Sequence, residues 1–374
     1  MLPTELSVQH GSTRINGIRY HYVEAGAGPL VLLLHGFPEN WWSWRYQIQP
    51  LAQAGLRVVA PDMRGYNDSG KQGPYDLNTL TSDVCELIRA LGAERAHLVG
   101  HDWGGAVAWH AASTRPACVD KLAVLNCPHP ALMAKALRSN WRQIKRSWHM
   151  FFFQLPVLPE WALLRSTASM FARVYAREGL HFPVEEVRPF VDGLHRPGAA
   201  KAMLGWYRAA FRGARRSRPS YPRIEDEVLL LWGKKDFALS YDDLIPGTKR
   251  YAPKLDIELF EGAGHFVHAA RPDAVNAALV EFFSTARGAA RPSREAKRRA
   301  AAQGRSTFNV VLANPGDNKI GVLRELRSIT GLELREAHEL IENIPRTIKE
   351  NASWQEAERI KSQLAAAGAT VEIT

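Results

Sequence analysis

Short, nearly continuous apolar runs alternate with stretches of helical apolar spacing through most of the chain. One such helical stretch covers residues 80–92. The apolar runs span residues 29–36, 56–62, 96–102, 121–127, 227–236 and 256–265. Strands that are apolar along their whole length and alternate with helices are typical of a parallel sheet covered on both faces. The pattern therefore predicts an α/β fold with a mostly parallel, doubly wound sheet.

The strand pattern stops after the fourth run and returns only before the fifth. Residues 131–218 between them are rich in Arg, Trp and Phe and have helical spacing without a comparable strand. Ligands of open α/β sheets bind outside the carboxyl ends of the strands. We therefore predict a core of residues 1–130 and 219–285, with residues 131–218 inserted as a helical lid over the site.

The last part of the chain has a separate pattern. A strand is predicted at 308–313, helices begin at Lys319, Glu333 and Ser353, and a final strand covers 369–374. Apolar residues fall on one face of each predicted helix. We expect residues 306–374 to form a small, independent α/β domain.

The net charge of +10 is uneven along the chain. Residues 286–305 contain seven Lys or Arg and one Glu, whereas residues 306–374 contain eight Lys or Arg and ten Asp or Glu. A basic run of this kind is usually a solvated linker. It lacks the aromatic residues that stack on bases, so nucleic acid is not the expected partner.

Cysteine content and hydropathy limit the classes of protein to which the chain could belong. Cys85, Cys118 and Cys127 are too few for a disulfide framework and lack metal-ligand spacing. We expect Cys85 and Cys118 to be buried thiols. The sequence shows no signal peptide and no apolar run of membrane-spanning length. These features predict a cytoplasmic protein with no metal, no cofactor and no membrane partner.

The stretch "GHDWGG" at residues 100–105 joins an apolar run to an alanine-rich helical stretch. When a Gly-x-residue-x-Gly turn joins a strand to a helix, the side chain in the middle of the turn is held on a sharp and exposed bend. In this chain that side chain is Asp102. The helix N-terminus stabilises an anion there, and an ionised carboxylate is a nucleophile that needs no base. The alternative is that Asp102 only caps the helix.

The stretch "HGFP", His35 to Pro38, follows the first apolar run. In this architecture such a turn supplies the second donor of an oxyanion hole. The backbone N–H groups of Phe37 and Trp103 would then converge on one oxygen. The alternative is an ordinary strand-ending turn of Gly and Pro.

Two further candidates follow the last two apolar runs. Asp236 lies in "WGKKDF", and His265 lies in "GAGHF". The order nucleophile, acid, histidine is the order of the α/β-hydrolase fold, in which the acid orients the histidine as a base. A solvated loop acid at Asp236, and His268 in place of His265, are the alternatives.

These motifs together resemble the epoxide hydrolase family of the α/β-hydrolase fold, over the chain to about residue 285. Residues 35–69 are similar to the family's signature region, and "GHDWGG", "WGKKDF" and "GAGHF" match its nucleophile, acid and histidine motifs. The resemblance implies that Asp102 forms an alkyl ester with an epoxide. His265, oriented by Asp236, then activates the water that releases a 1,2-diol.

The resemblance also implies roles in the lid, where the family generally uses two tyrosines to hold the epoxide oxygen. "GWYRAAF" supplies Tyr207, whereas "SWHMFFFQLP" places His149 at the other position. A histidine also donates hydrogen bonds near neutral pH. The alternatives are a packed lid histidine and a tyrosine hydroxyl in water. Phe37, Trp103 and Trp148 are the expected substrate contacts.

Dehalogenases with the same Asp nucleophile are the nearest alternative. The Trp103 indole is suited to a halide, but haloalkane dehalogenases lack the tyrosine pair and usually carry Asn or Glu where this chain has Phe37. Haloacetate dehalogenases place Arg after the nucleophile, where this chain has Trp103. Lid His and Trp residues such as His149 and Trp148 also occur in those enzymes.

The tail resembles the C-terminal domain of the bacterial ribosomal stalk protein, which recruits translational GTPases through a helical face. His338 stands where that family commonly has lysine, and Arg324 replaces another lysine. The resemblance implies a possible protein partner, and the alternative is a stabilising appendage. The matching positions are Lys319, Arg324, Arg327, Leu334, Arg335 and Glu336.

Overall fold

The computed structural model describes residues 6–216, 221–284, 308–316, 318–352 and 354–373. It contains two compact units, which meet in the sequence between Asn276 and Ala277. The predicted basic linker at 286–305 lies outside the described residues.

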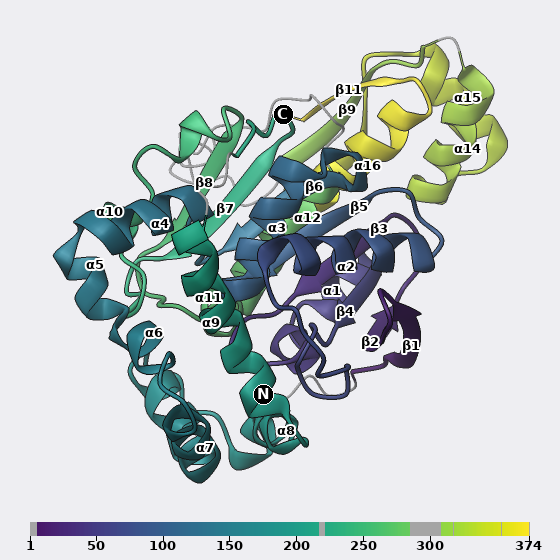
Figure 1. The fold of residues 1–374 in the computed structure, drawn as a ribbon. Coiled ribbons are helices and arrows are strands. Elements are labelled where there is room, and N and C mark those ends of the chain that lie inside the picture. The colour runs from purple at the N-terminus through teal and green to yellow at the C-terminus, as the bar shows by residue number, and fades with distance from the viewer. Residues whose placement is uncertain (1–5, 217–220, 285–307, 317, 353, 374) are drawn as a thin grey trace. The chain divides into compact units, whose positions relative to one another are not determined.

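The first unit is built on an eight-stranded sheet in the order β1-β2-β4-β3-β5-β6-β7-β8 (Figure 1). The six predicted apolar runs are β3 to β8, and neighbours among them are parallel. The strands are β1 (Gln9–Ile15), β2 (Ile18–Ala25), β3 (Leu30–Leu34), β4 (Arg57–Pro61), β5 (Ala96–His101), β6 (Val119–Leu125), β7 (Val228–Gly233) and β8 (Leu255–Phe260). The predicted α/β-hydrolase topology is thereby confirmed.

The N-terminal hairpin of β1 and β2 was not predicted. Strands β1 and β2 pair antiparallel with each other, and β2 joins them to the sheet by pairing antiparallel with β4. Most residues of β1 are exposed or half-buried, so its sequence carries no continuous apolar run. By contrast, β3 and β5 are buried at every residue, which explains their unbroken apolar sequences.

Helices cover the sheet between successive strands. The predicted helix at 80–92 is α2, which begins earlier because Asp76 caps it by accepting the Thr79 N–H at 3.1 Å. The helices of this layer are α1 (Ile48–Gln53), α2 (Leu77–Ala90), α3 (Asp102–Thr114), α10 (Tyr241–Leu244), α11 (Val267–Ala270) and α12 (Pro272–Ser284). Short 3-10 turns occur at Trp41–Trp44, Pro116–Cys118 and Thr248–Arg250.

Six helices lie between β6 and β7, in the segment for which we proposed a lid, and Figure 1 shows them gathered on one side of the sheet. A buried ion pair joins them to the core, since Arg45 Nη2 lies 2.9 Å from the Glu186 carboxylate. Removing one partner of such a pair costs about 3–5 kcal/mol. The lid helices are α4 (Pro130–Ser139), α5 (Trp141–Arg146), α6 (Trp148–Phe152), α7 (Leu158–Ala176), α8 (Val184–His195) and α9 (Ala199–Arg216).

The expectation of unpaired cysteines is wrong for two of the three. Cys85 of α2 and Cys118 form a disulfide, with Cα atoms 5.7 Å apart. The packing of α2 against α3 brings the two residues together across 33 positions of sequence, a separation at which no local pattern signals the pairing. Cys127 is a buried free thiol.

The second unit contains a three-stranded antiparallel sheet in the order β10-β9-β11. Its edge strand β10 was not predicted, because Ile348 is its only large apolar residue. The helices begin where the sequence predicts them, within one residue. The elements are β9 (Phe308–Asn314), α14 (Lys319–Thr330), α15 (Leu334–Glu342), β10 (Arg346–Ala352), α16 (Trp354–Ala366) and β11 (Thr370–Ile373).

Among the helices that the structure describes, none combines the length and the apolar composition required to cross a membrane.

Candidate active site

The three predicted triad residues meet at the carboxyl ends of neighbouring parallel strands. Asp102 directly follows β5, while Asp236 and His265 follow β7 and β8. His265 Nδ1 lies 2.8 Å from Asp236 Oδ2, and His265 Nε2 lies 3.6 Å from Asp102 Oδ2. The imidazole therefore lies between two carboxylates.

Asp102 occupies a tight turn that only small neighbours allow. Its φ is +50°, a left-handed conformation that Asp tolerates better than most residues. A Cβ on Gly36 would lie 2.4 Å from the Asp102 Cβ, so the opposite loop needs glycine there. The Asp102 carboxylate accepts the Phe37 N–H at 2.9 Å, and the N-terminus of α3 has no side-chain cap. These contacts argue against the helix-cap alternative.

The charges around Asp102 favour its ionised form. Burial alone raises the pKa of Asp102, but the hydrogen bond and charge of His265, the charge of His101 and the Phe37 N–H together lower it well below its usual range. The side chain is still 20% exposed. Asp102 is thus an ionised carboxylate that a small molecule can reach.

The same contacts act in the opposite direction on His265. Burial lowers the pKa of His265, but Asp236 and Asp102 outweigh it and raise the pKa well above its usual value. The backbone is held as well, because the Glu178 carboxylate on the lid accepts the N–H groups of His265 and Phe266.

Asp236 is a buried, fully engaged acid, unlike the solvated loop acid of the alternative interpretation. Its Oδ1 accepts the N–H groups of Ala238 and Leu239, each at 2.8 Å, and its Oδ2 accepts the Asn126 amide at 2.8 Å. Asn126 was missed by the sequence analysis. Its position directly after β6, at the same sheet edge, is the signal that could have identified it.

His35 fixes the loop that carries the Phe37 N–H. Its Nδ1–H donates to the Gly36 carbonyl at 2.9 Å, and its Nε2 accepts the Met63 N–H at 3.0 Å. Burial lowers the pKa of His35, which favours the neutral ring that this pair of bonds requires. The predicted second donor, the Trp103 N–H, belongs to the first turn of α3, where N–H groups lack helical partners.

Two predicted lid residues reach the core site through ring contacts. The Tyr207 ring lies 5.1 Å from Phe37 and 5.0 Å from Trp103, both edge-on. His149 lies 6.2 Å from Tyr207. Burial, and then the charge of Asp102, raise the pKa of Tyr207, whereas burial lowers the pKa of His149. Both groups therefore favour their neutral forms.

Trp148 differs from these residues. Its side chain is 64% exposed, and its ring contacts those of His149 and Phe152. The structure does not bring it beside the triad, in contrast to the predicted substrate contact. Phe37 and Trp103, by comparison, pack directly on Tyr207.

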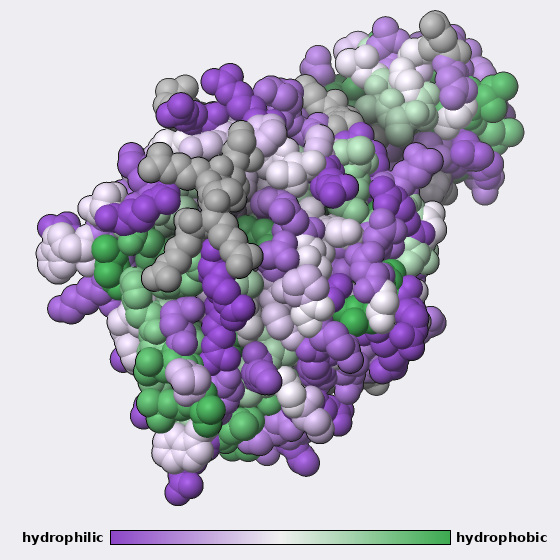
Figure 2. Space-filling model, in the orientation of Figure 1, coloured by the Kyte–Doolittle hydropathy of each residue, from purple (hydrophilic) through white to green (hydrophobic). Residues whose placement is uncertain are grey.

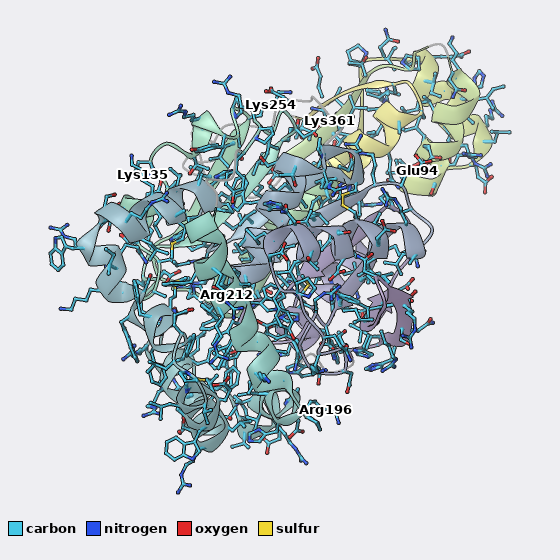
Figure 3. The ribbon with its side chains drawn as sticks, in the orientation of Figure 1. Glu94, Lys135, Arg196, Arg212, Lys254 and Lys361 are labelled. Carbon is cyan, nitrogen blue, oxygen red and sulfur yellow. A yellow bond between two sulfur atoms is a disulfide. The ribbon has the colours of Figure 1, made fainter. Side chains whose placement is uncertain are left out.

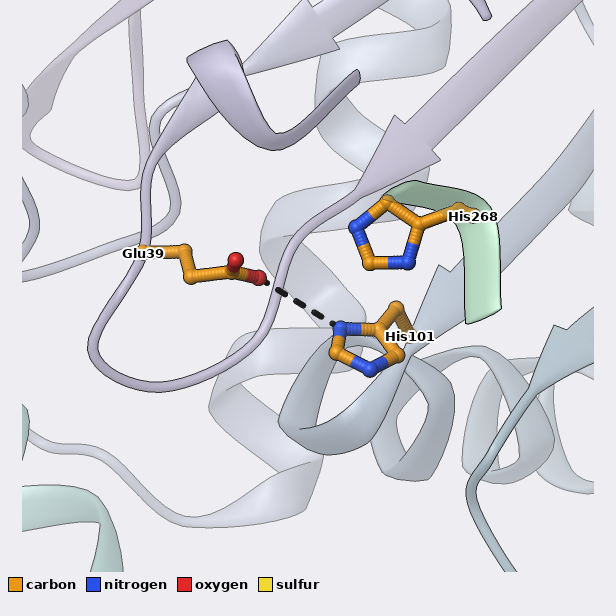
Figure 4. A group of neighbouring side chains, drawn as sticks. All are labelled: Glu39, His101 and His268. Carbon is orange, nitrogen blue, oxygen red and sulfur yellow. Dashed lines mark ion pairs between the residues drawn. The ribbon is translucent and has the colours of Figure 1, made fainter. Parts of the chain in front are cut away.

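A second buried group consists of Glu39, His101 and His268 (Figure 4), and it contacts the triad through His265. His101 donates from Nε2 to the His265 carbonyl at 3.0 Å, and its Nδ1 lies 3.5 Å from Glu39. Glu39 also accepts the Tyr175 hydroxyl at 2.9 Å. Burial raises the pKa of Glu39, but His101 and His268 lower it to about 2.

The sequence analysis gave Glu39 and His101 no role, although both stand within or beside the quoted motifs. With His268 they offer three potential metal ligands within 4.8 Å of one another. Glu39 already accepts the Tyr175 hydroxyl and lies 3.5 Å from His101 Nδ1, so we assign no metal to this group.

In the second unit, the residues that match the stalk-protein resemblance lie on two packed helices. Lys319, Arg324 and Arg327 are exposed on α14, and Leu334 and Arg335 are exposed at the start of α15. Exposed cations and one apolar residue therefore share this pair of helices.

Comparisons with known proteins agree with this geometry. Residues 29–272 match the alpha/beta hydrolase fold family, and residues 308–374 match the ribosomal protein L7/L12 C-terminal domain. The chain is 40% identical over 275 residues to an AB hydrolase superfamily protein of Bacillus subtilis, covering 71% of this chain and 95% of that protein. It is 35% identical over 277 residues to Epoxide hydrolase 3 of Mus musculus, covering 71% and 74%.

Solved structures give the same result. A variant of an epoxide hydrolase from Bacillus megaterium superposes with a TM-score of 0.67 at 28% identity, covering 74% of this chain and all of that one. Epoxide hydrolase A from Mycobacterium thermoresistibile gives 0.64 at 31% identity, covering 74% and 98%.

The fold and site thus define a hydrolase. The chain belongs to the alpha/beta hydrolase fold family, in its epoxide hydrolase branch, and carries a C-terminal domain of the ribosomal L7/L12 type.

Proposed function

We propose that this chain hydrolyses an epoxide to a 1,2-diol through an ester on Asp102. The observation that carries the proposal is the placement of one ionised carboxylate between the Phe37 N–H and the His265 imidazole. An aspartate nucleophile displaces a leaving oxygen at an sp³ carbon without a proton transfer to start the reaction. The epoxide hydrolases among the relatives and solved structures support the substrate class.

In the first step an Asp102 oxygen attacks an epoxide carbon, and the bond between that same carbon and the epoxide oxygen breaks. The negative charge moves from Asp102 to the epoxide oxygen, which Tyr207 and His149 stabilise by hydrogen bonding. Tyr207 retains its proton for this purpose because burial and Asp102 raise its pKa. Donors placed where charge develops are the largest source of catalysis in such sites.

In the second step His265 removes a proton from a water molecule, which attacks the ester carbonyl of Asp102. The Phe37 and Trp103 N–H groups stabilise the oxyanion. The bond between the Asp102 carbonyl carbon and the substrate oxygen then breaks, and that oxygen takes the proton held by His265. The second water proton neutralises the alkoxide left by the first step, so Asp102 is again a carboxylate and the diol leaves. Formation of the ester removes the Asp102 charge that raises the pKa of His265. Alkylation therefore lowers the pKa of His265 and increases the fraction of the imidazole in the neutral form that can accept a proton in the step that follows.

The nucleophile is tested with Asp102→Asn and Asp102→Ala, the first of which keeps the size and backbone preference of Asp. Both are expected to lower turnover of a styrene-oxide-type epoxide by more than about 10³-fold, because the group that forms the ester is absent. His265→Gln is expected to accumulate the ester, detected as added mass on the Asp102 peptide. Diol formation at the wild-type rate by Asp102→Ala would refute the proposal.

Dehalogenation is the alternative reaction for the same nucleophile. The Trp103 indole is the group that would donate a hydrogen bond to a halide. In this site it interacts with the Tyr207 hydroxyl and offsets part of the increase in the pKa of Tyr207. This contact favours an oxygen substrate. A panel of epoxides, haloalkanes and fluoroacetate, scored for diol and for halide, distinguishes the reactions, and halide release without diol would favour the alternative.

For the second unit we propose a protein partner that contacts α14 and α15. The exposed Lys319, Arg324, Arg327, Leu334 and Arg335 support this role. A pull-down with the full chain is expected to lose its partner on Arg324→Glu with Arg327→Glu. Arg359→Glu, an exposed substitution on α16, serves as the control. Unchanged capture by the double variant would favour the alternative of a stabilising appendage.

A further inference from the structure

The lid exposes an unusual concentration of large apolar side chains. Eleven large hydrophobic residues are exposed among the described residues, and eight of them lie between Trp141 and Leu164. We call the exposed apolar side chains of this range the lid patch. Figure 2 shows hydrophobic residues gathered over α6 and α7 at the lower left. A contiguous exposed surface of this kind marks an interaction site more often than chance exposure.

The connection between α6 and α7 holds part of the lid patch in an unfavourable conformation. Val157 has φ +63°, which a β-branched residue rarely adopts, and its side chain is 74% exposed. Leu158 and Trp161 follow in the first turn of α7 and are also exposed. Backbone strain that places an apolar side chain in water supports an interaction role for this loop.

Cations surround the lid patch, and acids are nearly missing from it. Residues 130–176 contain seven Lys or Arg and a single acid, Glu160, which pairs with Arg208 at 2.6 Å. Arg142 lies over the Trp141 ring at 6.0 Å, and Arg165 lies over the Trp161 ring at 5.5 Å. Cationic and apolar groups are therefore interleaved.

Lys135 of α4 points outward at the same side of the molecule (Figure 3). Two other lid acids face the core, since Glu186 pairs with Arg45 and Glu178 binds the loop of His265. Asp243, outside the lid in the sequence, lies near Arg142 and Arg146. Hydrogen bonds lower its pKa most, and the charges of these two arginines lower it further. The remaining lid acids, Glu185 and Asp192, are exposed on α8, and Asp192 pairs with Arg188 at 3.5 Å. Within residues 130–176 the cations therefore outnumber the acids by seven to one.

We propose that the lid patch docks this chain onto an anionic lipid surface. Tryptophan side chains favour the membrane interface, and Lys and Arg extend apolar stems beneath charged ends that reach anionic head groups. A second copy of the same face is disfavoured, because it would oppose cations with cations. Surface docking needs no spanning helix, so this proposal departs from the expectation of no membrane partner.

The lid patch also borders the candidate site. Trp148 is exposed on α6, while the next residue, His149, contacts Tyr207. One short helix therefore has a side chain on the lipid-facing surface and another at the site. The docking itself does not depend on the reaction proposed above, and it is measured without turnover.

The test is co-sedimentation of the full chain with vesicles of phosphatidylcholine alone or with added phosphatidylglycerol. The chain is expected to bind the anionic vesicles at least about tenfold more tightly, and to dissociate at high salt. Equal binding to both compositions, or no binding to either, would overturn the proposal.

Two variants assign the binding to the lid patch. Leu158→Ser with Trp161→Ser removes apolar contact, and Arg142→Glu with Arg165→Glu reverses charge. Each is expected to weaken anionic-vesicle binding by about tenfold or more. The matched controls are Val184→Ser and Arg188→Glu, exposed substitutions on α8 that should bind as the wild type does. Circular dichroism and turnover of a water-soluble epoxide verify that each variant is folded.

The basic segment at 286–305 is an independent source of attraction to anionic lipid. Arg298→Glu with Arg299→Glu measures its contribution. Loss of binding in this variant together with full binding by both lid-patch variants would overturn the proposal. Concentration-dependent dimerisation that Trp161→Ser abolishes, without vesicle binding, would identify a second copy as the occupant and also overturn it.

Discussion

The core half and the lid half of the candidate site are held by different interactions. Asp236 accepts three hydrogen bonds besides the one from His265. Asp102 accepts a backbone N–H on a strained turn. Tyr207 and His149, in contrast, approach through ring contacts of about 5 to 6 Å with other aromatic residues. Directional bonds from several groups hold the proposed nucleophile and base, whereas ring packing, supplemented by the contact of the Trp103 indole with the Tyr207 hydroxyl, holds the lid residues.

This difference separates two tasks. In the proposed mechanism the nucleophile and base must keep their geometry through two chemical steps, and a network of buried hydrogen bonds is preorganised for that purpose. The lid must admit substrates and then place donors on one oxygen, a task for which adjustable aromatic contacts suffice. Substitutions in the core half should therefore affect the chemistry more strongly than those in the lid half.

Asp236→Asn should produce the largest effect in this comparison. The amide cannot stabilise the imidazolium, and its N–H₂ group disfavours the required tautomer of His265. By analogy with triads, hydrolysis of the ester should slow by about 10³-fold or more, while ester formation continues. Rapid-quench measurement of ester formation and decay tests this. Asp242→Asn, an exposed acid nearby, is the control, and equal slowing of both steps would contradict the division of tasks.

Tyr207→Phe should affect the other step and by less. Loss of one donor to the developing alkoxide is expected to slow ester formation by about 100-fold, with His149 still present. Tyr66→Phe provides a matched control, since it removes a buried hydroxyl that has no hydrogen-bond partner. Single-turnover rates decide the matter, and an unchanged rate in Tyr207→Phe would remove this residue from the mechanism.

The pH dependence tests the electrostatic coupling between Asp102 and His265. His265 acts as a base only when neutral, which requires a pH above its pKa. That pKa is raised in the free enzyme by Asp236 and by Asp102, and the Asp102 contribution disappears in the ester. The pKa of His265 should therefore be lower in the ester than in the free enzyme. Ester hydrolysis should slow about tenfold per pH unit below that lower pKa.

Two measurements make this comparison. NMR titration gives the pKa of His265 in the free enzyme and in Asp102→Asn, and pre-steady-state kinetics gives the pKa for ester hydrolysis. The Asp102→Asn value should match the kinetic value. A kinetic pKa equal to that of the free wild-type enzyme would show that the two carboxylates do not act on His265 in the way proposed.

Glu178→Gln should have the smallest effect, because this lid residue acts on the site only through the backbone of His265 and Phe266. An amide oxygen can still accept one of the two N–H groups, but a neutral acceptor is weaker than a carboxylate. The hydrolysis step should slow by about fivefold, equivalent to about 1 kcal/mol. Glu185→Gln, exposed on α8, is the control, and equal slowing of ester formation would indicate a general loss of structure.

Local patterns account for the part of the site that could be predicted. Asp102 and Asp236 each follow a fully buried strand, and His265 follows the partly exposed edge strand β8. Parallel strands bring their carboxyl ends to one edge. The glycines around Asp102 also signal a close approach, which the contact between Gly36 and Asp102 explains. The same logic predicted the six parallel strands, because a buried strand must be apolar along its length.

The remaining features depend on contacts between distant segments. Glu178 meets His265 across 87 positions, and His101 contacts the carbonyl of that residue across 164. The Cys85–Cys118 disulfide follows from helix packing. None of these pairs has a spacing or composition signal in a single sequence. Trp148 illustrates the converse, since sequence placed it near the site but could not determine which way it faces.

Asn126 extends the row of strand ends in one further respect. It has φ +40°, as Asp102 has +50°, and its amide contacts the Asp236 oxygen that binds His265. Aspartate and asparagine are nearly isosteric, and both tolerate this backbone conformation. The sheet edge therefore has two positions from which an acid could orient His265, one after β6 and one after β7. Relocating that negative charge between them would be a short evolutionary step that leaves the backbone unchanged.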